Sequence, residues 1–157
     1  MWSVREIQTW RTPGTKKPEN PAKKLLSSYL AAIRERDGLI DEINRHYARA
    51  VSCTSHISPI PTGGNAAYDR TSESIADMLD AQDRLKLAIG KLNATVDRIM
   101  TLWETMEDGK QKELLLYRYI RGLKWEDIQD VMGYERSQIY VIHGKALLSF
   151  NKLMQNS

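Results

Sequence analysis

The sequence lacks the residues that would build a disulfide, a metal centre or a membrane span. Of its 157 residues only Cys53 is a cysteine, so an intrachain disulfide cannot form and we expect a reduced thiol. His56 is the only histidine close to it in sequence, which leaves too few ligands for zinc. No apolar run is long enough to span a bilayer, and no apolar stretch follows the basic N-terminal residues as in a signal peptide. We therefore expect a cytoplasmic protein with no metal, no other cofactor and no membrane partner.

The sequence also lacks the arrangements typical of enzymes. It has no Gly-rich phosphate loop, no recognisable pair of carboxylates and no Cys/His or Ser/His arrangement beyond chance, so we expect no catalysis. The net charge is only +3, but it is unevenly distributed. Residues 1–51 carry ten Lys/Arg against six Asp/Glu, residues 52–109 five against nine, and residues 110–157 eight against five. A basic C-terminal segment beside an acidic middle permits a nucleic-acid contact at that end without requiring one.

Two long helices are expected in the first two thirds of the chain. Residues 1–19, with Pro13, Gly14 and Pro18, indicate a flexible basic arm, in which Trp2 and Trp10 would dock on a neighbouring helix or on a partner subunit. Residues 20–107 are expected to form a helical hairpin and oligomerisation region. Its first helix begins at Pro21 with Asn20 as N-cap. A flexible loop covers 51–71, and the second helix, capped by Ser72, runs to about Glu107.

Both helices carry an apolar seam at alternating three- and four-residue spacing, which predicts coiled-coil-like antiparallel packing. The second seam is longer than the first, so we expect either other subunits or the C-terminal helices to cover its excess. The first alternative favours a homo-oligomer, a dimer or higher. The predicted seams are Tyr29, Ile33, Arg36, Ile40, Ile43, Tyr47 and Ala50 in the first helix, and Ile75, Met78, Gln82, Leu85, Ile89, Leu92, Val96, Ile99, Trp103 and Met106 in the second.

Residues 108–157 are expected to form a helix-turn-helix DNA-binding domain. Asp108-Gly109 precedes a helix over 110–120, followed by one over 125–132 and one from about 136 to 153. Gly133 lies between the last two, where a turn needs a positive φ that glycine adopts at low cost. A short helix, a three-residue turn and a longer helix are the signature of this motif. Trp125, Ile128, Val131 and Met132 are expected to face inward, and His143 to be structural.

One face of the last helix is predicted to contact DNA. At 100° per residue Ile139, Ile142, Ala146, Phe150 and Leu153 fall together on the core side. In this motif the first turns of the opposite face enter the major groove, where an arginine reads guanine or phosphate and a glutamine reads adenine or braces the backbone. A tyrosine or lysine there suits a phosphate, and a glycine allows a close approach of the strand. The predicted DNA-binding residues are Arg136, Ser137, Gln138, Tyr140, Val141, Gly144 and Lys145.

The residue order in this segment resembles region 4 of sigma-70 factors. The resemblance rests on Trp125-Glu126-Asp127-Ile128, Met132-Gly133-Tyr134 and Lys145-Ala146-Leu147. With the phrase at 116–128, LYRYIRGLKWEDI, and the helical layout before it, the chain is similar to sigma-like late-gene transcriptional regulators of phages, of the ArpU and RinA kind. The resemblance implies a phage or prophage protein in a bacterial cytoplasm that binds double-stranded DNA and activates transcription, with RNA polymerase as a further candidate partner.

Several residues depart from the sigma pattern. Arg136 matches the Arg, Glu and Gln set expected on the outward face, but Ser137, Tyr140 and Val141 do not, so we do not expect the standard −35 sequence to be the target. Lys124 and Glu135 stand where hydroxyl N-caps are expected, which predicts weak binding by a single module. Two other functions stay open: a small terminase-like DNA-packaging adaptor, and a sigma-like module that binds RNA polymerase or another protein without reading DNA.

Overall fold

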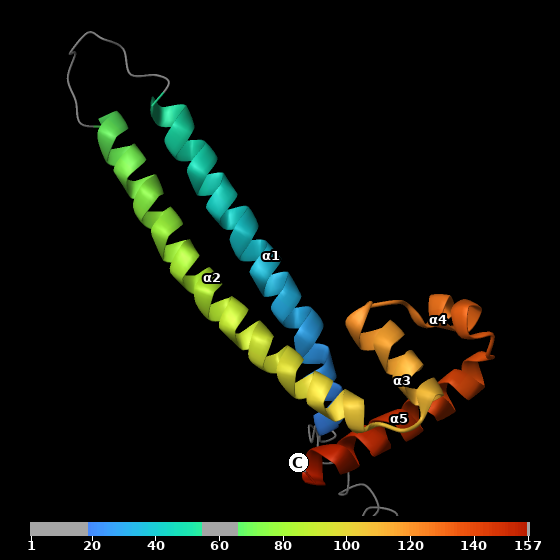
Figure 1. Ribbon diagram of the computed structural model, residues 1–157. Helices are drawn as coiled ribbons and strands as arrows, with labels where there is room; N and C mark the ends of the chain where they lie inside the picture. The colour runs from blue at the N-terminus through green and yellow to red at the C-terminus, as the bar shows by residue number, and fades with distance from the viewer. Residues whose placement is uncertain (1–18, 55–65, 157) are drawn as a thin grey trace, which may run out of the picture.

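The computed structural model describes residues 19–54 and 66–156, and all the regular elements within these ranges are helices (Figure 1). The expected all-α class is therefore confirmed. Trp2, Trp10 and residues 55–65 of the expected loop lie outside the described ranges. None of the described helices is long and apolar enough to cross a membrane. In chain order the elements are α1 (Pro21–Thr54), α2 (Ala66–Thr105), α3 (Gly109–Leu115), the π-helix η2 (Leu116–Ile120), α4 (Trp125–Met132) and α5 (Arg136–Asn156).

The bounds of the two long helices are set by where proline, glycine and capping side chains occur. Asn20 caps α1 as predicted, since its Oδ1 accepts hydrogen bonds from the backbone N–H of Ala22 and Lys23 at 3.0 and 3.3 Å. The predicted loop over 51–71 is too long, because α1 continues to Thr54 and α2 already begins at Ala66. The segment 66–71 contains no proline or glycine to stop a helix, so Ser72 is an interior residue rather than a cap.

The two long helices pack side by side and antiparallel, as the seams predict (Figure 1). The residues that face the partner helix differ in part from the predicted ones. Leu39 is buried in place of Ile40, and His46 is more buried than Tyr47. In α2 the buried positions repeat every seven residues and include the small side chains Ser74, Ala81 and Ala88. Ile40, Tyr47, Ile75 and Ile89 are exposed instead, so their placement in the seams was wrong.

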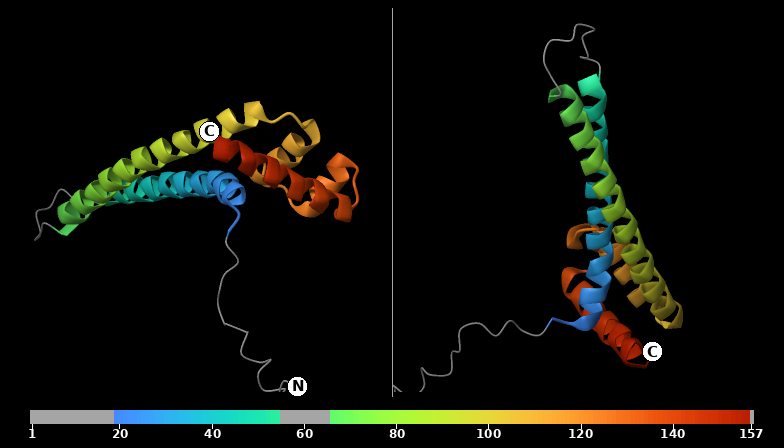
Figure 2. Two further views of the ribbon diagram at one scale, coloured as in Figure 1. Left: turned by 90° about the horizontal axis from the view of Figure 1, so that it is seen from below. Right: turned by 90° about the vertical axis from the view of Figure 1, so that its left-hand side faces the viewer.

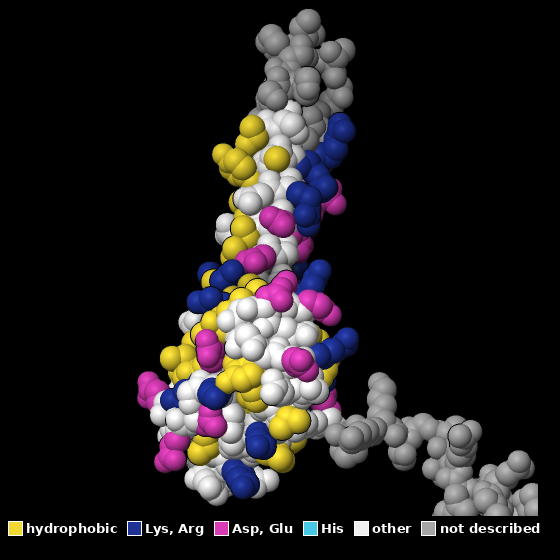
Figure 3. All heavy atoms as spheres, turned by 90° about the vertical axis from the view of Figure 1, so that its right-hand side faces the viewer, with side chains coloured by type: hydrophobic (Ala, Val, Ile, Leu, Met, Phe, Trp, Pro, Cys, Tyr) yellow, Lys and Arg dark blue, Asp and Glu magenta, His cyan; other side chains and the backbone are white. Residues whose placement is uncertain are grey.

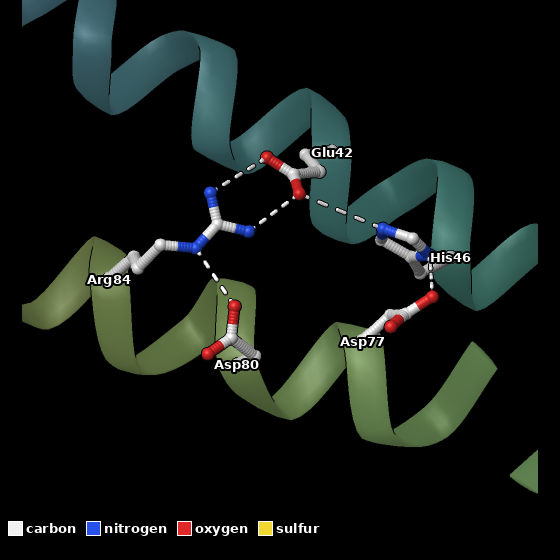
Figure 4. A network of polar contacts seen from close by, with 5 residues as sticks. All are labelled: Glu42, His46, Asp77, Asp80 and Arg84. Carbon is white, nitrogen blue, oxygen red and sulfur yellow. Dashed lines mark hydrogen bonds and ion pairs between the residues drawn. The ribbon is translucent and has the colours of Figure 1, made fainter. Parts of the chain in front are cut away.

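A network of charged side chains crosses from α1 to α2 on one face of the hairpin (Figure 4). Arg84 lies between two carboxylates, with Nη2 2.6 Å from Glu42 Oε1 and Nε 3.0 Å from Asp80 Oδ2. The hydrogen bond from Arg84 lowers the pKa of Glu42. His46 lies 3.8 Å from Glu42 and 3.7 Å from Asp77. These contacts place Glu42 level with Arg84, and His46 level with Asp77, along the hairpin.

The base of the hairpin lies beside the C-terminal helices (Figure 2). The two parts share a hydrophobic core. The lower end of the α2 seam is therefore covered by the chain's own C-terminal helices, which is the second of the two predicted alternatives. The proposed division into a hairpin region and a DNA-binding domain thus crosses one continuous core. Its buried members are Ala22 and Leu26 of α1; Ile99 and Leu102 of α2; Met106; Leu115 and Tyr119; and Ala146, Leu147 and Phe150 of α5.

A second link between the two parts is polar. Asn151 of α5 lies beside the first turn of α1, where its Oδ1 accepts from the backbone N–H of Ala22 at 2.8 Å. Its Nδ2 donates to Asn20 Oδ1 at 2.9 Å. One side chain of α5 therefore contacts the N-cap residue of α1 and gives the N–H of Ala22, which has no partner within the helix, a second acceptor besides Asn20.

Candidate nucleic-acid interface

A tight turn joins α4 to α5, as the sequence predicts, and the use of this helix pair as a DNA-binding helix-turn-helix stays a prediction. α4 ends at Gly133, whose φ of 69° and ψ of 26° are left-handed. Its N–H donates to the carbonyl of Gln129 at 2.9 Å, which closes the end of the helix. Tyr134 and Glu135 complete the turn before α5 begins at Arg136. Gly133 therefore occupies the conformation that its position in the sequence predicts.

A small core beneath the turn fixes the orientation of α4 and α5. Leu114 of α3, Ile128 of α4 and Ile139 of α5 are completely buried and pack together. Because each comes from a different helix, they hold the three helices as one unit. Val131 was predicted to face this core but is 56% exposed, so that prediction was wrong. It lies at the end of a short helix whose inward positions are taken by Ile128 and Met132.

The outward face of α5 carries the residues predicted to contact DNA. All seven are exposed, and they lie on the first half of the helix, opposite the buried Ile139, Ala146 and Phe150. Nothing within 4 Å would meet a Cβ at Gly144, so the backbone there is open to a ligand. The face therefore exists as predicted; its contact with DNA stays a prediction. Its residues are Arg136, Ser137, Gln138, Tyr140, Val141, Gly144 and Lys145.

A row of side chains in contact with one another supports the first turns of this face. The guanidinium of Arg136 lies 5.7 Å from the ring centre of Tyr140, and Tyr140 packs against Trp125 of α4 at 5.1 Å. The guanidinium of Arg118, from η2, covers Trp125 at 4.5 Å and donates to the carbonyl of Leu123 at 2.8 Å. The contact with the Tyr140 hydroxyl raises the pKa of Arg136, so its positive charge is retained. Trp125 is thus only half-buried, and it supports the outer face as well as the core.

His143 lies on the inner edge of the same helix and confirms the expectation of a structural role. A hydrogen bond of 2.9 Å joins its Nε2 to the hydroxyl of Tyr119, and its ring packs against Trp125 at 5.0 Å. Burial, together with the positive charges of Lys23 and Arg118, lowers its pKa from 6.5 to about 4. The ring is therefore neutral at physiological pH. Neither this contact nor the Arg118 stack can be read from sequence spacing, because each joins different helices.

The two helix N-termini that lack hydroxyl caps use side chains from their own first turns. Asp127 Oδ2 accepts from the backbone N–H of Lys124 at 3.3 Å, and Gln138 Oε1 accepts from that of Glu135 at 3.3 Å. Each is the reciprocal half of a capping box, in which the third helical residue reaches back to the cap. Gln138 therefore has a local partner as well as an exposed position.

The surface at this end of the molecule mixes both signs of charge with apolar side chains (Figure 3). A shallow pocket of about 370 Å³ lies beside the outward face, lined by Ser137, Gln138 and Val141 of α5 together with Lys110, Tyr134 and Ile142. Within the described ranges, no group of three His, Cys, Asp or Glu residues could hold a metal ion. The side chains of Cys53 and His56 lie outside what the structure describes.

No family model, curated protein or solved structure matches the chain. The function is therefore inferred from the residues and their geometry.

Proposed function

We propose that the protein is a sequence-specific DNA-binding regulator of transcription, which inserts the first half of α5 into the major groove. The observation that carries the proposal is the outward face of α5. Its basic, amide and hydroxyl side chains are all exposed on the first turns of the second helix of a helix-turn-helix. Arg136 and Lys145, at opposite flanks of this face, supply the positive charge that phosphate contacts need.

The row of side chains behind the face supports a role for Arg136 in reading bases. A side chain that stacks on Tyr140, which itself rests on Trp125, has fewer rotamers to lose on binding than a freely solvated arginine. An ordered guanidinium matches the bidentate acceptors of guanine in the major groove. We propose that the sigma-70 region 4 and phage late-regulator resemblance reflects this use, with activation as the outcome and RNA polymerase as a further partner.

The proposal is tested by binding of purified protein to DNA from its own gene neighbourhood at two salt concentrations. We expect Arg136→Ala to weaken binding to the preferred fragment by about 5- to 100-fold and to reduce discrimination between fragments. Lys145→Ala is expected to weaken binding to all fragments alike and to lower the slope of log affinity against log salt by about one.

The matched control is Arg34→Ala, which removes the same charge from an exposed position of α1. It is expected to leave discrimination unchanged. Equal loss in Arg136→Ala and Arg34→Ala would show that only net charge matters. Wild-type protein that binds all fragments equally would contradict sequence-specific regulation and favour a packaging adaptor.

A second candidate function is supported by the apolar side chains at the centre of the same face. Val141 and Leu148 are 57% and 61% exposed, one on each side of Gly144 in the sequence. Such residues suit a protein surface as well as a thymine methyl. A module that grips RNA polymerase or another protein would lose its partner on Val141→Asp while Arg136→Ala has no effect. DNA reading predicts instead that both changes weaken binding.

A further inference from the structure

One face of the α1–α2 hairpin exposes several large apolar side chains, and this face is here called the apolar face. It consists of Ile40 and Tyr47 of α1 and of Ile75, Leu79, Ile89 and Met100 of α2, which are 40–61% exposed. In Figure 3 hydrophobic side chains gather on one edge of the upper hairpin, and Lys and Arg gather there on the opposite edge. Several of these residues satisfied the heptad pattern of the sequence but do not face the partner helix.

Helix geometry explains why these residues share one side. Ile40 follows the buried Leu39 by one position, and Ile75 and Ile89 follow the buried Ser74 and Ala88. A step of one residue turns by 100°, and in an antiparallel pair this turn brings both sets to the same side. Residues one position before the seam lie on the other side, as the Glu42–Arg84 ion pair demonstrates.

We propose that a second copy of this chain covers the apolar face, forming a dimer whose twofold axis runs along the hairpin. α1 of one copy then packs on α2 of the other, which gives a four-helix bundle with both sets of C-terminal helices at the same end. The face extends over about 25 residues of α2, so it is about 38 Å long and, across two helices, about 20 Å wide. The resulting area of roughly 750 Å² matches the ~800 Å² per partner of a standard stable interface.

The charges on the apolar face select this orientation. The level pairs Glu42–Arg84 and His46–Asp77 place Asp37 level with positions 86–89 of α2. Asp37 and Lys86 therefore lie near the middle of the face. With the axis along the hairpin, Asp37 of each copy faces Lys86 of the other. With the hairpins reversed, α1 would face α1, so that Asp37 would meet Asp37 and Lys86 would meet Lys86, an unfavourable contact.

The ion pairs that Asp37 and Lys86 make within one chain do not prevent them from pairing with each other across the dimer. Asp37 contacts Arg36 at 2.7 Å and Lys86 contacts Asp83 at 3.0 Å, and all but Arg36 are more than half exposed. Exposed pairs of this kind contribute little and rearrange readily. At the base, the apolar face continues into a pocket of about 220 Å³ lined by Tyr29, Val96, Met100, Trp103, Leu116 and Ile120, which extends the surface toward the C-terminal helices.

The experiment measures the mass of the purified full chain by sedimentation equilibrium over a range of concentrations, without DNA. We expect about twice the 18.0 kDa of one chain for the wild type. Leu79→Glu with Ile89→Glu should raise the dissociation constant at least about tenfold, because dimerisation would bury unpaired carboxylates. Leu87→Glu is the matched control, since Leu87 is 68% exposed on α2 away from this face, and it should remain dimeric.

Orientation is tested by charge reversal and by distance. Lys86→Asp should weaken the dimer, and Asp37→Lys in the same chain should restore it. Spin labels on position 53, in the last turn of α1, should lie less than about 25 Å apart, whereas reversed hairpins would place them about 50 Å apart. A monomeric wild type, a Leu79/Ile89 variant that stays dimeric, no rescue, or the longer distance would each overturn the proposal. A closed ring of eight or more copies would overturn it too. Because no step uses DNA, failure here is distinct from failure of the proposed DNA binding.

Discussion

Single residues of the outward face owe their geometry to partners that lie far away in sequence. Arg136 contacts the ring of Tyr140, and Tyr140 packs against Trp125. The guanidinium of Arg118 covers the ring of Trp125. The sequence was sufficient to place Arg136 and Tyr140 on the outer side of α5, because that depends only on helical periodicity. It was not sufficient to find Arg118 or the surface role of Trp125, because a cation–π contact between helices depends on how they pack.

His143 predicts how stability depends on pH. Its pKa is about 4 in the folded chain against about 6.5 when unfolded, so the unfolded state binds the proton first as pH falls. The contribution of the neutral His143 ring to the free energy of unfolding is therefore complete above pH 6.5 and is lost between pH 6.5 and about 4. The full shift corresponds to roughly 3 kcal/mol, and because the ring is only partly buried we expect about half of it.

Chemical denaturation at pH 7.0 and pH 4.5 measures this loss. His143→Gln keeps a hydrogen-bonding amide beside Tyr119 but does not titrate, and should remove part of the pH dependence. A wild-type curve and a His143→Gln curve that fall in parallel would assign the loss to the carboxylates instead.

At the level of the element, the hairpin shows where heptad reasoning succeeds and where it fails. The spacing of apolar residues predicts two long antiparallel helices, and these are present. The pattern could not decide between Ile40 and Leu39, since both are apolar and straight helices drift by about 20° per heptad. It also passed over Ser74, Ala81 and Ala88, because small residues carry little hydrophobic signal although they occupy the interface.

Within α5, a substitution at Gly144 is expected to change the stability of the helix and the affinity for DNA in opposite directions. A Cβ at this position would meet nothing within 4 Å, so Gly144→Ala should stabilise the helix by about 0.5–1 kcal/mol. If a DNA strand approaches the backbone there, the same methyl group should weaken DNA binding several-fold. Thermal unfolding and DNA titration of one variant measure both effects. A more stable protein with unchanged affinity would remove Gly144 from the interface.

At the scale of the whole molecule, the hairpin and the C-terminal helices are held together by one core and by Asn151. The sequence predicts 20–107 and 108–157 as separate parts, because no periodic pattern predicts contacts between α5 and the first turn of α1. The sequence predicts that the α2 seam is longer than the α1 seam, but it does not decide whether other subunits or the C-terminal helices cover the excess. Leu102 and Phe150, both in this cluster, show that the C-terminal helices are the partner at the base.

Asn151→Ala tests the polar part of this link. It removes the hydrogen bonds to Ala22 and Asn20 and leaves the N–H of Ala22 with one acceptor fewer, so we expect a loss of about 1–2 kcal/mol. Asn156→Ala, an exposed position near the end of the same helix, is the control and should change stability by less than about 0.5 kcal/mol. Urea unfolding of the two variants gives the comparison, and equal stability would show that Asn151 adds nothing to the link.

The length of α2 has a mechanical consequence. Its 40 residues make an arm about 60 Å long, anchored at one end in the core that also holds α5. A tilt of about 10° at that anchor moves the far end by about 10 Å, by the arithmetic of a rigid rod of that length. A force applied at the far end of α2 therefore produces a larger force at the core that holds α5. A molecule that binds the distal turns of the hairpin could therefore change the tilt of α5, the helix that we propose reads DNA.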